Sequence, residues 1–189
     1  MKDMGPDNQI RGMHIVRDHT KKVMWLSQEK YVTNVLQRFS MVDVKPLGLT
    51  LPKNYKLSGK QSLKTKANKD EMIKIPYASA IVSLVYEMVC IRTDIGYSVG
   101  VVSRFMSNLG RKHWFAVKWI LRYLKVTSSV CLRFGSGKTL LEGFIDSYMS
   151  ADIDTSRSTS GYVMTYEGEA ISWQSRLQKS ATLSTIEAE

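Results

Sequence analysis

The first part of the chain changes from the two-residue period of strands to the longer period of a helix. Residues 13–18 and 23–27 are rich in β-forming side chains, and residues 19–22 between them predict a hairpin connection. A helix is predicted next, with Ser27 as its cap and an end before Lys45-Pro46. Its apolar stripe consists of Tyr31, Val32, Val35, Leu36 and Phe39.

A lysine-rich connector separates this unit from three further helical periods. Residues 46–75 are interrupted by proline and glycine and are poor in aromatic residues, which indicates a linker. One helix is then predicted from Pro76, and a second is predicted to be capped by Thr93 or Asp94 and to end near residues 108–110. The third predicted helix carries Trp114, Val117, Ile120, Leu121 and Leu124.

After Thr127 the hydrophobic period returns to two. Strands are predicted at residues 130–134, 140–146, 161–166, 170–174 and 180–183, with turns rich in glycine and serine between them. Ser184 and Glu187 form a capping-box pattern, which predicts that a helix begins at the last residues of the chain. The fold class is therefore predicted to be α/β, and we expect the last domain to be truncated.

Charge is distributed unevenly along the chain. The net charge is +10, but residues 141–189 hold eight acidic and three basic residues, so this part carries −5 and the first 140 residues carry +15. A basic body favours a polyanionic partner such as nucleic acid, because lysine and arginine release condensed counterions when they neutralise phosphates. Solubility alone is an alternative explanation for the same excess.

Composition predicts a folded chain in which no segment crosses a membrane. Hydrophobic residues make up 43% of it, which supports a core, and no apolar stretch approaches the roughly 20 residues that cross a bilayer. The N-terminus has no secretion signal, so we expect an intracellular location, in either the cytoplasm or the nucleus. Cys90 and Cys131 are predicted to be reduced, half-buried thiols.

Carboxylates near the end of the chain are candidate ligands for a metal ion. Asp146 ends a predicted strand, Asp152 and Asp154 follow in a loop, and Glu187 and Glu189 open the last helix. Carboxylates placed in this way can converge on a divalent cation. Acidic residues in loops and at helix N-termini are, however, more often solvated or stabilise a helix dipole.

Other catalytic patterns are missing from the sequence. None of the three histidines has the context of a catalytic triad, and His113 is predicted to lie on a helix surface. Residues 135–139 lack the first glycine of a phosphate-binding loop and predict a turn. Zinc-ligand spacing is also absent.

The third predicted helix combines aromatic and basic residues. Trp114 and Trp119 alternate with cations, so this helix contacts either a protein core or nucleic acid. The basic residues predicted to contact nucleic acid are Lys112, Lys118, Arg122 and Lys125.

Seven strings in this sequence resemble those of copia-type retrotransposon Pol polyproteins, in the same order. They are WLSQEKY at 25–31, PYASAIVSL at 76–84, VSRFMSN at 102–108, LRYLK at 121–125, STSGY at 158–162, AISWQS at 170–175 and LSTIEAE at 183–189. Together they extend over nearly the whole chain. The resemblance implies a parent polyprotein that is an RNA-directed DNA polymerase with ribonuclease H activity.

The resemblance also implies a division into four segments. Residues 1–45 would be the end of the reverse-transcriptase palm with its following helix, 46–75 a linker, 76–127 a helical thumb or connection segment, and 128–189 the N-terminal half of an RNase H-like mixed sheet. Asp146 and Glu189 match metal-binding carboxylates of the family, which implies Mg²⁺ or Mn²⁺. The implied partner is an RNA–DNA hybrid or another nucleic acid, and no membrane.

Departures from the family pattern predict that the RNase H site is incomplete. Residues 146–152 are DSYMSAD where the family has DADWAGD, Thr93 replaces a proline, and Arg11 stands at an apolar position of the palm hairpin. The polymerase's own Tyr-x-Asp-Asp motif does not occur in the chain. We therefore expect the isolated chain to be inactive as an enzyme. Sequence-independent binding of nucleic acid is the alternative.

Overall fold

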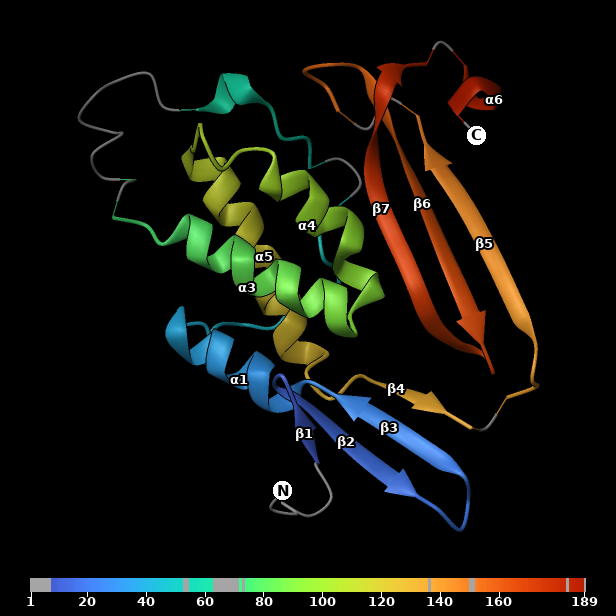
Figure 1. Cartoon of the computed structure of the whole chain (residues 1–189). Coiled ribbons are helices and arrows are strands. Elements are labelled where there is room, and N and C mark those ends of the chain that lie inside the picture. Colours follow the sequence, from blue (N-terminus) through green and yellow to red (C-terminus); the bar gives the residue numbers. More distant parts are fainter. Residues whose placement is uncertain are drawn as a thin grey trace, which may run out of the picture.

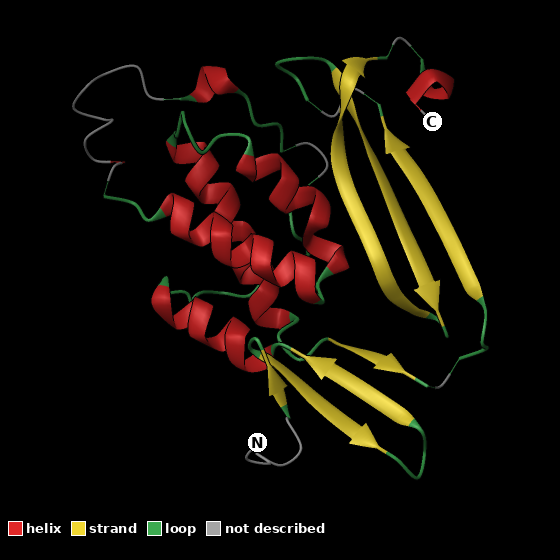
Figure 2. Ribbon diagram, in the orientation of Figure 1, coloured by secondary structure: helices red, strands yellow, loops and turns green. Residues whose placement is uncertain are grey.

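The computed structural model describes residues 8–52, 55–62, 72, 74–135, 137–149, 152–182 and 184–188. Five α-helices, two 3-10 helices and two antiparallel sheets form this part of the chain. Most of the helices form the body of the molecule, with one sheet at its lower end and the other along one side (Figure 1 and Figure 2). The predicted α/β class is confirmed.

A four-stranded antiparallel sheet joins the start of the chain to its middle. In spatial order it consists of β1 (Gln9–Ile10), β2 (Met13–Asp18), β3 (Val23–Ser27) and β4 (Cys131–Phe134). The predicted hairpin is confirmed, with Ile15 opposite Leu26. On the other side of β3, Leu132 is opposite Leu26, so β4 extends the hairpin sheet and does not pair with the later strands.

Four helices pack together between the sheets, and two short 3-10 turns and a short last helix complete the helical elements. The four are α1 (Glu29–Arg38), α3 (Tyr77–Cys90), α4 (Gly96–Ser103) and α5 (Arg111–Val126); the turns are η1 (Gly59–Gln61) and η2 (Thr93–Ile95), and the last helix is α6 (Thr185–Ala188). In the part of the chain that the structure describes, no helix has the length and hydrophobicity needed to cross a bilayer. Cys90 and Cys131 are free and half-buried, as predicted.

The first predicted helix is confirmed, with one change at its start. Val32, Val35 and Leu36 of α1 are buried, as the stripe predicts. The residue at the cap position is Gln28, and Ser27 belongs to β3, so the predicted cap is one residue early. The Ser27 hydroxyl still accepts a hydrogen bond of 3.3 Å from the backbone N–H of Glu29 and so satisfies one unpaired donor of the first turn.

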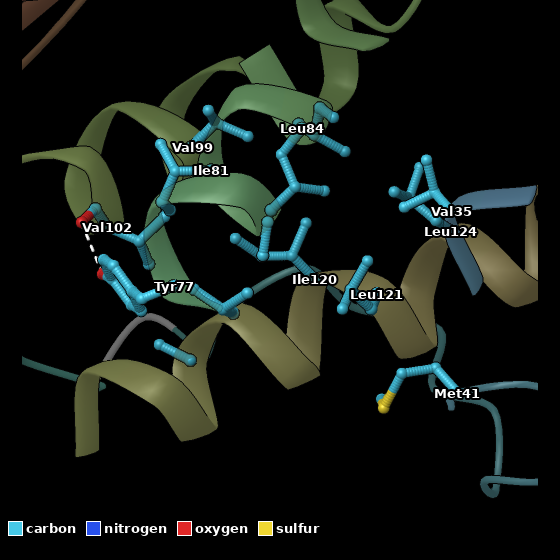
Figure 3. Close-up of a cluster of buried hydrophobic side chains, with 14 of the residues drawn as sticks. Val35, Met41, Tyr77, Ile81, Leu84, Val99, Val102, Ile120, Leu121 and Leu124 are labelled. Atoms are coloured by element: carbon cyan, nitrogen blue, oxygen red, sulfur yellow. Dashed lines mark hydrogen bonds between the residues drawn. The ribbon is translucent and has the colours of Figure 1, made fainter. Parts of the chain in front are cut away.

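Helix α5 supplies the centre of the hydrophobic core. Its side chains belong to one buried cluster with Val35 of α1, Leu84 of α3 and Val99 of α4 (Figure 3). The Tyr77 hydroxyl donates a hydrogen bond of 2.6 Å to the carbonyl of Val102, which joins α3 to α4. Burial of each leucine or isoleucine contributes about 1.5–3 kcal/mol. The fully buried residues of α5 are His113, Ala116, Val117, Ile120, Leu121 and Leu124.

The second predicted helix is shorter than expected and lacks the predicted cap. Thr93–Ile95 form η2, and α4 ends at Ser103 instead of near residues 108–110. The Asp94 carboxylate accepts hydrogen bonds from the Arg92 guanidinium at 2.9 and 2.7 Å and from the Tyr123 hydroxyl at 2.7 Å, so it does not cap the helix. Burial alone would raise the pKa of Asp94, but these hydrogen bonds outweigh burial and hold that pKa below its ordinary value.

The second sheet contains β5 (Leu141–Tyr148), β6 (Arg157–Tyr166) and β7 (Glu169–Ala181), in that spatial order. All of its described pairing is antiparallel, so the expected mixed sheet is not found in these residues. A single strand, β7, replaces the two predicted at 170–174 and 180–183, because Arg176 and Leu177 between them also pair with β6. Leu183 lies outside the described residues.

The second sheet is attached to the helices by aromatic side chains. The Trp173 indole N–H of β7 donates a hydrogen bond of 2.8 Å to the carbonyl of Met88 in α3. The Tyr148 ring of β5 meets the Tyr97 ring of α4 edge-on, with 6.1 Å between the ring centres. One face of this sheet therefore lies toward α3 and α4.

Glu87 is a buried carboxyl group that has no hydrogen-bond partner among the described residues. It lies on α3 and is fully shielded from solvent. Burial raises its pKa to about 8, even though the neighbouring Arg92 acts to lower that pKa. Glu87 is therefore protonated at pH 7, and the fold avoids the cost of an unpaired buried charge.

Replacing Glu87 with glutamine is expected to remove a loss of stability at high pH. The pKa of Glu87 is about 8 in the folded state and 4.5 ordinarily, so between these values the folded state holds more protons than the unfolded state. The stability that results is full below pH 4.5 and is lost as the pH rises through 8, by at most about 1.4 kcal/mol per pH unit. Urea unfolding at about pH 5, 7 and 9 measures this effect. Equal pH dependence in the wild type and Glu87→Gln would contradict it.

Candidate functional site

Asp146 lies on the face of the second sheet that points toward the helices. It is opposite Gly161 in β6, and Gly161 is opposite Ser175 in β7, so these three residues share one face. Ser175 lies against Gly96 at the start of α4. The exposed Asp146 side chain contributes to a cleft of about 770 Å³ between this sheet and the end of α3.

The cleft around Asp146 is mainly apolar. Its lining includes Met88, Val89, Tyr97, Phe144 and Trp173. Asp94 also lines it, but its carboxylate is already held by Arg92 and Tyr123. A divalent cation such as Mg²⁺ is held by several oxygen ligands. Within the described residues of the cleft, Asp146 is the one carboxylate without a partner.

The carboxylates of the loop after β5 bind the helical body instead of facing Asp146. Asp152 is buried and lies 3.5 Å from the Arg104 guanidinium, and it also accepts a hydrogen bond from the Thr155 hydroxyl. Asp154 accepts hydrogen bonds from the Ser58 hydroxyl at 2.5 Å and from the backbone N–H of Gly59 at 2.6 Å. These two hydrogen bonds hold the pKa of Asp154 below its ordinary value. Both aspartates therefore fasten the loop.

The final helix lies near the opposite face of the sheet from Asp146. The Gln178 amide donates hydrogen bonds of 2.6 Å to the Ser160 hydroxyl and to the carbonyl of Ala188 in α6. Ser160 is next to Gly161 in β6, so its side chain points away from the Asp146 face. The predicted cap is present, since the Ser184 hydroxyl accepts a hydrogen bond of 3.1 Å from the backbone N–H of Glu187.

The metal site predicted at Asp146 and Glu189 stays a prediction. Glu189 lies outside the described residues. Among the residues that are described, no three His, Cys, Asp or Glu side chains lie close enough together to hold a metal ion. The described part of the chain therefore does not assemble a donor set for Mg²⁺ or Mn²⁺ around Asp146.

His113 is buried, and its predicted position on a helix surface is wrong. It is fully shielded from solvent and stacks on Phe105, with 4.1 Å between the ring centres and 7° between the ring planes. The backbone N–H of Gly110 donates to Nδ1 at 2.9 Å, and Nε2 lies 3.2 Å from the carbonyl of Ser58. A neutral imidazole with its proton on Nε2 satisfies both contacts. Burial lowers the pKa of His113 and outweighs the hydrogen bond to Ser58, which acts to raise it.

A short network therefore joins three distant segments of the chain. Ser58 contacts Asp154 through its hydroxyl and His113 through its carbonyl. The loop after β5 is thus linked to the start of α5 through the connector. His113 lies four residues before Val117, in the same row as the buried residues of α5, and this spacing is the sequence signal that could have placed it in the core.

The structure places three of the four predicted nucleic-acid residues on one side of α5. Lys118, Arg122 and Lys125 follow the helical repeat, whereas Lys112 lies about 120° around the helix from Lys118. The Arg122 Nε donates to the carbonyl of Lys45 at 2.6 Å, and the Lys125 ammonium donates to the carbonyl of Val44 at 2.9 Å. Two of the cations therefore also hold the segment after α1.

A groove of about 640 Å³ runs along this basic side of α5. Lys118 lies over two rings, 5.6 Å from the centre of Trp114 and 5.9 Å from the centre of Phe115. No acidic side chain is among the described residues that line the groove. We call this the α5 groove; its lining is Phe39, Ser40, Met41, Val44, Lys45, Tyr55, Phe115, Lys118, Trp119 and Arg122.

Comparison with known proteins gives matches to retrotransposon polyproteins along all or most of this chain. The retrovirus-related Pol polyprotein from transposon TNT 1-94 of Nicotiana tabacum is 53% identical over 189 residues, which are all of this chain and 14% of the tobacco protein. The Pol polyprotein from transposon RE1 of Arabidopsis thaliana is 33% identical over 165 residues, 87% of this chain and 11% of that protein. This chain belongs to the copia-type retrotransposon Pol polyproteins.

This Pol chain spans only a seventh or less of the length of those polyproteins. A shorter relative, the secreted RxLR effector protein 161 of Plasmopara viticola, is 40% identical over 119 residues, which are 62% of this chain and 84% of the effector. No protein-family model and no solved structure matches the chain.

Several residues of this Pol segment were missed by sequence reasoning. Ser58 and Arg104 fasten the β5–β6 loop, and Lys45, Tyr55 and Phe115 line the α5 groove. Phe115 had a detectable signal, because residues three and seven positions after it on the same side of α5 are cations. The others lie in connecting segments, where no periodicity indicates which way a side chain points.

Substitution of His113 is expected to weaken the fold of this Pol segment. His113→Ala removes a stacked ring and two hydrogen bonds and should lower the free energy of unfolding by about 3 kcal/mol in urea titrations. Lys112→Ala, at the exposed neighbouring position, is the control and should change it by less than about 0.5 kcal/mol.

Comparison of the wild type with His113→Ala also tests the protonation state of His113. Its folded-state pKa lies below the ordinary 6.5, so the stability that neutral His113 contributes is present above pH 6.5 and is lost as the pH falls. The wild type should therefore lose stability between about pH 6.5 and 5 more steeply than His113→Ala. A pH profile that is identical in the two proteins would rule out a buried neutral imidazole.

Proposed function

We propose that this chain is the segment of an RNA-directed DNA polymerase polyprotein that leads from the polymerase into its ribonuclease H domain, and that the isolated chain has no nuclease activity. The observation that carries the proposal is the match to the tobacco Pol polyprotein along the full chain at 53% identity. The seven family strings, which occur in the family's order from residue 25 to residue 189, support the same assignment.

The arrangement around Asp146 supports the lack of nuclease activity. Hydrolysis of a phosphodiester by two metal ions requires carboxylates that hold the ions about 3.5–4 Å apart, so that they stabilise the attacking and leaving oxygens. In the described residues, Asp152 is bound to Arg104 and Asp154 to Ser58, which leaves Asp146 without a second carboxylate. Loss of one ligand weakens ion binding and charge stabilisation together.

We expect no Mg²⁺-dependent cleavage of an RNA–DNA hybrid by the isolated chain. A labelled hybrid incubated with the wild type should release no more product than the same hybrid incubated with Asp146→Asn, because no group of metal ligands forms around Asp146 among the described residues. Gel separation of the products measures this. Cleavage that requires Mg²⁺ and disappears in Asp146→Asn would overturn the proposal.

A second candidate function, sequence-independent binding of nucleic acid, is favoured by the α5 groove. Lys118, Arg122 and Lys45 line it, and no carboxylate does so among the described residues. Cations grouped in this way neutralise phosphates and release counterions, a contribution that does not depend on base sequence. The net charge of +15 in the first 140 residues adds long-range attraction for the same partner.

Binding to nucleic acid is expected to be steeply salt-dependent and to involve Lys118. Three phosphate contacts predict that affinity falls by more than about tenfold between 50 and 200 mM salt. Lys118→Gln should reduce the slope of log affinity against log salt by about 1, whereas Lys118→Arg should keep it. Fluorescence anisotropy with a labelled oligonucleotide measures both.

Lys21→Gln is the matched control for this experiment. Lys21 lies in the turn of the N-terminal hairpin, and 76% of its side chain is exposed. The substitution Lys21→Gln removes the same charge at a position that is far from α5 in the sequence. If the affinity is the same at both salt concentrations, or if Lys21→Gln lowers the slope as much as Lys118→Gln, the α5 groove is not the binding site.

A further inference from the structure

The α5 groove combines its cations with the exposed aromatic ring of Phe115. Phe115 is 58% exposed, although the next residue of α5, Ala116, is fully buried. Trp119 and Tyr55 are half-buried and meet at a tilted angle, with 5.5 Å between their ring centres. Exposure of a phenylalanine removes its burial contribution of about 1.5–3 kcal/mol, so folding alone does not explain why a ring stands at position 115.

Lys118 links the aromatic and the basic parts of the groove. Its ammonium group lies within 6 Å of the centres of both Trp114 and Phe115, which is cation–π distance. The charge therefore lies over the exposed Phe115 ring, 5.9 Å from the ring centre. A flat ligand that covers this ring would carry any attached negative group into contact with Lys118.

Arg122 provides a second positive group that is fixed in position. Its Nε is bonded to the carbonyl of Lys45, and no other partner of its guanidinium is found among the described residues. The hydrogen bond holds Nε in place and leaves the terminal N–H donors of the guanidinium for a ligand. Arg122 follows Lys118 by one helical turn, about 6 Å along α5.

We propose that the α5 groove binds unpaired nucleic acid, with a base stacked on Phe115 and neighbouring phosphates paired with Lys118 and Arg122. In a duplex the bases are stacked on each other, whereas an unpaired strand offers free base faces to aromatic side chains. A site that recognised only phosphates would need the cations but not the exposed ring. This inference rests on the nucleic-acid binding proposed above and specifies the form of nucleic acid.

The test compares a single-stranded oligonucleotide of thymidines with a duplex of the same length, by fluorescence anisotropy at low salt. The wild type should bind the single strand more tightly than the duplex. Phe115→Ala should weaken binding of the single strand about tenfold and leave duplex binding within about twofold, because only stacking is lost. Phe115→Trp, which keeps an aromatic face, should restore the affinity.

Phe144→Ala is the matched control. Phe144 is also 58% exposed, but it lies in β5 on the cleft side of the second sheet and does not line the α5 groove. Its substitution should leave the affinity for the single strand unchanged. Circular dichroism of each variant identifies any that fail to fold, and Phe115→Leu then provides a variant that keeps apolar bulk but loses the aromatic face.

The outcomes separate this inference from the function on which it rests. If neither oligonucleotide binds, the nucleic-acid function itself is wrong. If binding depends on salt and on Lys118, but Phe115→Ala and Phe115→Leu bind the single strand as the wild type does, the groove contacts phosphates only and the stacking inference is overturned. Equal losses in Phe115→Ala and Phe144→Ala would also overturn it.

Discussion

Burial of one face of α5 is the interaction on which the rest of the structure depends. Ile120, Leu121 and Leu124 fill the space between α1, α3 and α4. Because α5 is fixed, β4, the strand that follows it, lies beside β3 of the N-terminal hairpin. His113 at the start of α5 holds the connector through the carbonyl of Ser58. A helix that buries one side must expose the other. The position of the basic α5 groove is therefore a consequence of the core.

Two of the family strings, at residues 121–125 and 170–175, make contacts that hold the fold together. In residues 121–125, two leucines lie in the core, Tyr123 binds Asp94, and Arg122 and Lys125 hold the carbonyls of the segment after α1. The tryptophan of AISWQS fastens the second sheet to α3. The residues of these two strings thus keep the helices and sheets of this chain together.

Carboxylates in this chain have different roles because their surroundings differ. Asp94 is ionised and held by Arg92, Glu87 is protonated in the core, and Asp154 fastens a loop. Asp146 faces the cleft without a partner among the described residues. The net acidic charge of residues 141–189 therefore does not by itself indicate a metal site. Some of these carboxylates attach the second sheet to the rest of the molecule. The cations of α5 hold the segment after α1, and some of them also line the exposed groove.

The sequence by itself determined the N-terminal hairpin, the helices at α1, α3 and α5, the presence of strands after Thr127, and the family. The spacing of hydrophobic residues, the capping residues and the family strings are local properties, so they can be recognised without the fold. Tertiary structure decided what depends on distant partners. Arg92 and Tyr123 bind Asp94, which therefore does not cap the helix. Pairing with β6 makes β7 one strand where two were predicted. β4 pairs with β3 of the first sheet and not with the later strands. His113 and Phe115 are two residues apart on one helix, yet packing buries the first and exposes the second. A local pattern shows which residues share a face, but only the packed chain shows what that face meets.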